Sequence, residues 1–192
     1  MKQTLTFFII LLVSYNLFSQ DKTFGVKIGY GISNAHAPNG TLLLRSNGTV
    51  GQDVSSFEYK PGYQIGITKR IELNSQKEKL HITGQYTTYG FKDNNSTIDL
   101  NYLELDINGF SEFGRKDNFY LAIGFGPAFL ISNSNEIEIS KKFDIRLNVM
   151  IGIKVLKQIN LFAQGKMGWI GLSKESKIKS YMLSLNTEIL LF

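Results

Sequence analysis

The sequence predicts an all-β protein, an eight-stranded antiparallel up-and-down transmembrane β-barrel that follows an N-terminal signal peptide. Three observations predict this fold. An apolar run too short to span a membrane lies near the N-terminus, apolar and non-apolar residues then alternate along most of the chain, and the non-apolar positions are rich in glycine. The 192 residues suffice for one domain, and a content of 43% hydrophobic and 12% aromatic residues is typical of a folded chain.

The first element is a secretory signal. Met1 and Lys2 form a short basic start, and residues 7–13 are all apolar. Because a membrane-spanning helix needs about 20 apolar residues, this shorter run, with the small residue Ser19 after it, predicts a cleaved signal peptide over residues 1–19 and a barrel domain over residues 20–192. A retained N-terminal anchor is the alternative. Loss of residues 1–19, which hold one lysine and no acid, lowers the formal charge from +5 to +4.

The sequence contains no cysteine. This excludes a lipoprotein anchor, disulfide bonds, a thiolate nucleophile and a cysteine-ligated zinc site.

Eight strands follow the signal, each recognised by large apolar side chains at every second position. In the first, the even positions of 24–32 are large and apolar and the odd positions are glycine or lysine. The same alternation returns at the odd positions of 57–67 and, most cleanly, at the odd positions of 143–155. The predicted strands are residues 23–33, 56–71, 79–91, 97–114, 119–131, 142–155, 160–172 and 179–191.

The links between these strands support a membrane barrel. The second, fourth and sixth links, residues 72–78, 115–118 and 156–159, are short and polar, whereas the first link, residues 34–55, is long and rich in Asn, Gly and Ser. With the N-terminus in the periplasm, the short turns lie on the periplasmic side and the longer loops lie outside, as in transmembrane β-barrels with an even number of strands.

The composition of the two strand faces gives the direction of the alternation. A soluble barrel points its apolar face inward, and a membrane barrel points it outward. Here the non-apolar face is dominated by glycine, for example Gly29, Gly31, Gly124 and Gly126, which suits a crowded lumen and not a solvated strand face. The bulky residues of the other face would overfill a narrow lumen, so we expect them to face lipid.

Charged residues share the glycine-rich face and, by parity, point into the lumen. We expect them to form a structural, salt-bridged network. Its predicted members are Lys27, Glu58, Lys60, Glu104, Asp106, Asp144, Arg146, Lys154, Lys166 and Glu188. A proton or ion pathway is the alternative. Glu104 and Asp106 are two residues apart and would also suit an acid–base pair or cation ligands, but the opposing cations favour the structural network.

One short motif resembles a catalytic one. His81-Ile82-Thr83 is similar to the His-x-Ser of barrel-embedded lipid A deacylases, and ester hydrolysis needs a base beside a hydroxyl nucleophile. The third strand starts in the periplasm, however, which places His81 away from the outer leaflet. His36 has no companion with metal-ligand spacing. We therefore expect no catalytic residue, no cofactor and no metal site.

Two strand motifs resemble those of a known family, residues 102–105 in the fourth strand and residues 120–127 in the fifth. The family that they resemble is the PorT-like outer-membrane β-barrels of Gram-negative bacteria, and the resemblance covers the whole mature chain. It implies a small eight-stranded barrel in the outer membrane, with lipid and the barrel insertion machinery as partners. Phe192 is similar to the C-terminal aromatic residue that this machinery recognises. Asp106 departs from the family, which often has proline there.

Function is assigned to the external loops by elimination. The lumen of an eight-stranded barrel is filled by side chains, which disfavours diffusive transport. The first long loop contains Leu42, Leu43, Leu44 and Arg45 among polar residues, and is the candidate contact surface for an envelope or extracellular protein partner. The predicted role is structural, adhesive or partner-binding, without catalysis. The alternatives are a narrow channel for ions or small solutes and an outer-membrane lipid-modifying hydrolase. Nucleic acid is not expected as a partner, because the aromatic residues belong to the strand frame.

Overall fold

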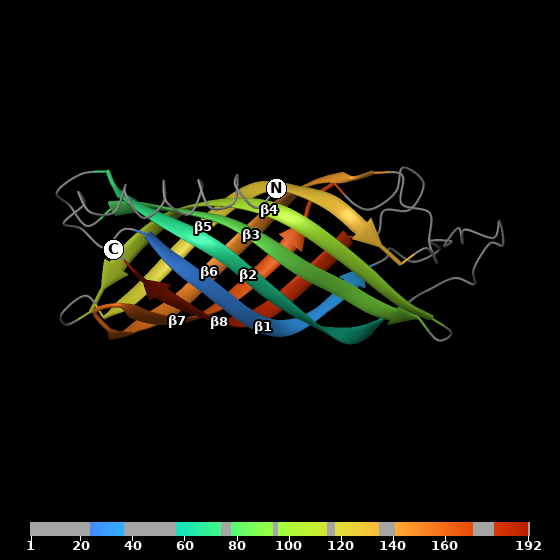
Figure 1. Cartoon of the computed structure of the whole chain (residues 1–192), viewed down its shortest axis with the longest axis horizontal. Helices are drawn as coiled ribbons and strands as arrows, with labels where there is room; N and C mark the ends of the chain where they lie inside the picture. The colour runs from blue at the N-terminus through green and yellow to red at the C-terminus, as the bar shows by residue number, and fades with distance from the viewer. Residues whose placement is uncertain are drawn as a thin grey trace, which may run out of the picture.

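The structure, a computed structural model, describes residues 24–36, 57–73, 78–93, 96–114, 118–134, 141–170 and 179–191 (Figure 1). The strands are β1 (Phe24–His36), β2 (Glu58–Glu72), β3 (Glu78–Asp93), β4 (Ser96–Phe113), β5 (Phe119–Asn133), β6 (Phe143–Leu156), β7 (Ile159–Gly168) and β8 (Lys179–Leu190). Within the described part of the chain, no helix is long and apolar enough to cross a membrane.

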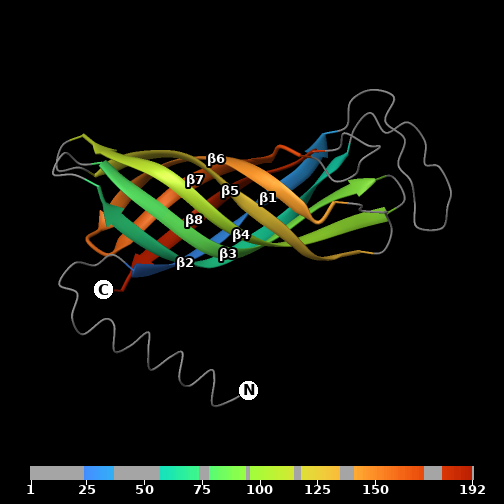
Figure 2. The ribbon, with the colours of Figure 1, turned by 90° about the horizontal axis from the view of Figure 1, so that it is seen from above.

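The eight strands form a closed antiparallel barrel. Each strand pairs with the next, and β8 pairs with β1 from Gly25 opposite Leu190 to His36 opposite Lys179. Figures 1 and 2 show the strands slanting around one long axis. Closure leaves no described strand as an open edge. The predicted all-β, eight-stranded fold is therefore confirmed.

We call the end where β1 begins and β8 ends the periplasmic end, and the opposite end the extracellular end.

The strand boundaries differ from the prediction mainly at the extracellular end. β1 continues to His36, and β3 and β4 continue to Asp93 and Ser96, so they approach each other more closely than predicted. β7 instead ends early, at Gly168. Just beyond this end, the carboxylate Oδ1 of Asp144 accepts a hydrogen bond of 2.8 Å from the backbone N–H of Ile170. Beyond the end of β7, the backbone donor of Ile170 is thus satisfied by a side chain and not by the ladder.

Large apolar side chains point away from the barrel axis. Ile145, Leu147 and Val149 expose 37%, 37% and 50% of their surfaces, whereas Asn148 between them is 1% exposed. Aromatic residues share this outer face: Tyr30, Tyr59, Tyr63, Phe119, Phe143 and Trp169 are exposed, and Tyr86 is half-buried. Such a continuous apolar exterior is stable in lipid and not in water, so the predicted inside-out arrangement is confirmed.

Aromatic residues also fill the lumen, and the expectation of a lumen of glycine and charges was incomplete on this point. One buried cluster lies toward the extracellular end, and a smaller one lies toward the periplasmic end on β4–β7. The first contains Ala35, Phe57, Tyr89, Phe91, Ile98, Leu100, Tyr102, Ala128, Leu130 and Met182, and the second contains Phe110, Tyr120, Ala122, Met150 and Phe162.

Inward-facing glycines make the room for these inward-facing rings. At Gly152, for example, an added Cβ would lie 2.5 Å from Cζ of Tyr120. Large and small residues thus alternate around the lumen, which is how a narrow barrel packs its interior.

Candidate functional site

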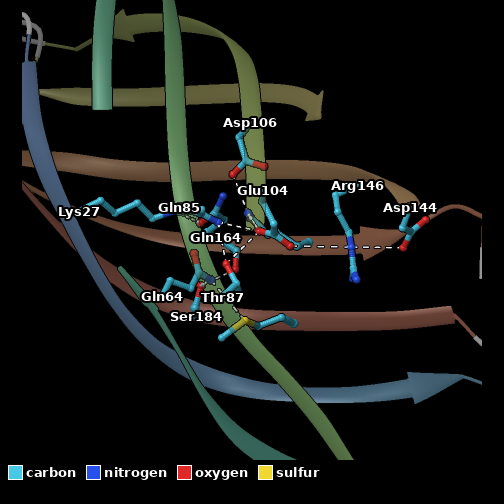
Figure 3. Close-up of polar contacts among 12 residues, drawn as sticks. Lys27, Gln64, Gln85, Thr87, Glu104, Asp106, Asp144, Arg146, Gln164 and Ser184 are labelled. Carbon is cyan, nitrogen blue, oxygen red and sulfur yellow. Dashed lines mark hydrogen bonds and ion pairs between the residues drawn. The ribbon is translucent and has the colours of Figure 1, made fainter. Parts of the chain in front are cut away.

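The centre of the lumen is an ionic group built around Glu104 on β4 (Figure 3). Its Oε2 accepts hydrogen bonds from Lys166 Nζ at 2.6 Å, Gln85 Nε2 at 2.7 Å and Thr87 Oγ1 at 3.0 Å. Lys166 Nζ also lies 2.6 Å from Asp106 Oδ2. The side chains of Glu104 and Lys166 are 0% exposed. Because these residues come from β3, β4 and β7, the group joins opposite walls of the barrel.

Arg146 on β6 extends the central group toward the extracellular end, with its Nε 3.9 Å from Glu104 Oε1. Its guanidinium carbon lies 4.3 Å from the ring centroid of Tyr89 and 4.4 Å from that of Tyr102. Its Nε lies 3.2 Å from Asp144 Oδ2, and its Nη1 donates a hydrogen bond of 2.7 Å to Ser180 Oγ. A planar guanidinium suits a position between two rings, where cation–π contacts and a carboxylate replace water.

Lys27 on β1 is held by amides. Its Nζ donates hydrogen bonds of 2.7 Å each to Gln85 Oε1 and Gln164 Oε1, and among the described residues it forms no ion pair. Gln85 in turn donates to Glu104, so the Lys27 charge is connected to the central carboxylate through one amide side chain.

A separate ionic group surrounds Glu188 on β8, nearer the periplasmic end. Glu188 is paired with Arg70 and lies 2.9 Å from His81 Nε2, while Asn160 Nδ2 donates to its Oε2 at 3.0 Å. The Arg70 guanidinium also lies 4.8 Å from the ring centroid of Phe110. The four polar residues of this group come from four strands, β2, β3, β7 and β8.

Further ion pairs lie at the ends of the barrel and involve acids that the predicted network omitted. Lys79 Nζ lies 3.2 Å from Glu72 Oε1 and 3.5 Å from Glu112 Oε1. At the periplasmic end, Lys154 Nζ lies 2.6 Å from Glu112 Oε1; at the extracellular end, Lys60 pairs with Asp99. The parity of Glu112, which it shares with Glu104, could have revealed it. Asp99 has the opposite parity on β4, so no periodic signal points to it.

Glu58 does not belong to the lumen network, and its predicted place there was wrong. Its side chain is exposed. The β2–β3 register shifts between Tyr59 and Gln64, and Glu58 is the first residue of β2, at the extracellular rim. Because a bulge adds one residue to a strand, the alternation of the regular part of β2 does not give the direction of the Glu58 side chain.

The predicted charges therefore form several groups and not one continuous network. The central group holds Lys27, Glu104, Asp106, Asp144, Arg146 and Lys166, and the other groups hold Glu188, Lys154 and Lys60. Aromatic clusters lie on both sides of the central group. Within the described residues, no set of three or more His, Cys, Asp or Glu side chains is placed to hold a metal ion. The described lumen is therefore a packed interior in which ion pairs and hydrogen bonds connect different strands.

Three predictions fall outside the described residues: the signal peptide over residues 1–19, the loop contact at Leu42, Leu43, Leu44 and Arg45, and the terminal Phe192.

Comparison with known proteins shows the same architecture. No protein-family model matches the chain, and no curated protein matches it. Among solved structures, the outer-membrane enzyme PagL has a TM-score of 0.55 and 11% sequence identity over 86% of this chain and 99% of its own. Neisserial surface protein A (NspA) has a TM-score of 0.52 and 16% identity over 88% of this chain and 97% of its own.

The protein is a small outer-membrane β-barrel. At these identities the likeness is one of fold alone. Together with the apolar exterior, it places the chain in the outer membrane of Gram-negative bacteria.

Proposed function

We propose that this barrel is a non-catalytic outer-membrane protein that presents its extracellular end to an envelope or extracellular protein partner. The observation that carries the proposal is the filled lumen: buried ion pairs at its centre are flanked by buried aromatic clusters. Solute passage would require these contacts to separate, so the surface available for recognition is at the ends of the barrel.

The extracellular rim is uneven, which supports recognition at that end. β3 and β4 have 16 and 18 residues, whereas β7 and β8 have 10 and 12. Figure 2 shows β3, β4 and β5 reaching far toward this end. We call residues 96–101 of β4 and 131–133 of β5 the raised wall. Its outward side chains include Thr97, Asn101 and Ser132, and Asn101 Nδ2 donates a hydrogen bond of 2.8 Å to Ser132 Oγ. These polar side chains lie beside the exposed Ile131, and the ladder holds them rigid, as a contact surface requires.

Site-specific photo-crosslinking in intact cells tests the proposal. A photoreactive residue at Thr97 or Ser132 should form a discrete protein adduct, and the same residue at Leu147, in the lipid-facing belt, should not. Deleting residues 40–47 tests the predicted Leu42–Arg45 contact in the same assay. Protein adducts absent at both wall positions in cells that express the folded barrel would contradict the proposal.

A narrow channel is the second candidate, and the polar middle of the lumen favours it. Both side-chain polar atoms of Asn148 and Oδ1 of Asn108 are buried without a protein partner, which suits internal water. We propose that this water does not form a continuous path. Purified protein in planar bilayers should then give no conductance steps, and reproducible steps would favour the channel.

We also propose that the chain is not a lipid hydrolase. His81 faces the lumen, is 2% exposed and is engaged by Glu188, so it does not meet lipid. Release of fatty acid from lipopolysaccharide that is lost in His81→Ala would establish the enzyme instead. Membership of the PorT-like family remains part of this proposal, supported by the strand motifs at 102–105 and 120–127.

A further inference from the structure

The extracellular rim of β6–β8 carries cations beside outward aromatic rings. Trp169, just after β7, is 58% exposed, and Lys179 Nζ at the start of β8 lies 5.3 Å from the centroid of its indole ring. Phe143 at the start of β6 is 42% exposed, and the half-buried Lys141 lies two residues before it in the chain. Indole rings and lysines of this kind occupy the level of lipid headgroups, with the rings toward the acyl chains and the ammonium groups toward the phosphates.

The buried network holds this rim in place. Asp144 Oδ1 accepts hydrogen bonds from the backbone N–H groups of Trp169 at 3.1 Å and Ile170 at 2.8 Å. On the other side, Arg146 binds Ser180, the neighbour of Lys179. Trp169 and Lys179 are thus attached to the same buried Asp144–Arg146 ion pair, which fixes their backbones before any ligand binds.

The charge of the rim differs between the two sides of the barrel. Along the described parts of β5–β8, no outward-facing position holds a carboxylate, and neither Lys141 nor Lys179 forms an ion pair with another described residue. On the opposite side, the cations have acidic neighbours: Lys92 lies opposite Glu58 in the β2–β3 ladder, and Lys60 pairs with Asp99. Among the described residues, the charge of the rim therefore favours an anion of the outer leaflet on the β6–β8 side.

We propose that the rim formed by Lys141, Trp169 and Lys179 binds the phosphate groups of a phosphorylated glycolipid of the outer leaflet. The indole packs against the lipid, and the two ammonium groups neutralise phosphate as point charges. The barrel then holds lipid on its β6–β8 side, and its β2–β4 side, with the raised wall, stays free for a protein. The lipid site does not depend on the proposed protein partner.

Native mass spectrometry of barrels released from phosphatidylcholine nanodiscs tests this site. The nanodiscs contain either bis-phosphorylated lipid A or the same lipid A after enzymatic dephosphorylation. The wild-type protein should retain the phosphorylated form preferentially. Each of Lys141→Gln and Lys179→Gln should weaken the binding of phosphorylated lipid A about fivefold, and the double variant should weaken it about 30-fold. These factors correspond to about 1 kcal/mol for each cation near the lipid surface. Lys179→Arg should bind like the wild type.

Lys92→Gln is the matched control, because Lys92 is an exposed rim lysine on the other side of the barrel. It should leave lipid binding unchanged, and all variants should keep heat-modifiable migration in detergent gels as proof of folding. Equal retention of phosphorylated and dephosphorylated lipid would overturn the proposal, as would equal effects of Lys92→Gln and Lys179→Gln. Displacement of the lipid by an equimolar amount of inorganic phosphate would overturn the assignment to a lipid ligand.

Discussion

Neutralising Glu104 is the sharpest test of the lumen core. In Glu104→Gln the amide keeps the shape of the side chain, but the carboxylate that accepts from Lys166 at 2.6 Å is lost. Removing one partner of a buried ion pair typically costs about 3–5 kcal/mol. Because Lys166 keeps Asp106 at 2.6 Å, we expect a loss near the lower limit, about 3 kcal/mol in the free energy of unfolding.

Urea unfolding in lipid vesicles, followed by tryptophan fluorescence, measures this loss. Glu58→Gln is the control, since the exposed Glu58 should change stability by no more than about 0.5 kcal/mol. The double variant Glu104→Gln/Lys166→Met should cost at least about 1 kcal/mol less than the sum of its single variants, because the two groups are in direct contact. Strict additivity, or a Glu104→Gln protein as stable as Glu58→Gln, would refute the buried ionic core.

Three other outcomes are expected from the packing. An apolar, thiol-reactive probe in the bilayer should label cysteine at Leu147 and not at Asn148, a comparison that the absence of native cysteine permits; labelling in the reverse order would invert the two faces. Gly126→Ala should destabilise the barrel by about 1–3 kcal/mol, because a Cβ there would lie 1.7 Å from a backbone oxygen. Gly165→Ala should be tolerated in the same urea titration, because a Cβ at Gly165 would have no neighbouring atom within 4 Å. Arg146→Lys should cost about 2 kcal/mol, since an ammonium cannot lie flat between the two tyrosine rings that enclose the guanidinium, and an unchanged midpoint would show that the planar stacking contributes nothing.

The alternation of side chains was readable from the sequence because it is local. A strand turns successive side chains to opposite faces, so the positions of Leu147 and Asn148 follow from parity alone. The same reasoning fails at Glu58, where a bulge in β2 breaks the count, and at the end of β7, where the Asp144 side chain replaces a ladder contact. In both places, a feature other than the regular strand pairing determines the path of the backbone.

The sequence by itself determined that the chain forms a barrel with apolar residues outside and glycine and charges inside. Only the tertiary structure decided which charges meet. Glu188 reaches His81 and Arg70, and Glu104 reaches Lys166, across the lumen between strands far apart in the sequence. These partners depend on the stagger between strands when the sheet closes, which accumulates around the whole barrel and leaves no trace in any single strand. The hydrogen bond from Trp169 to the buried Asp144 carboxylate, in contrast, depends only on the register of the neighbouring strands β6 and β7.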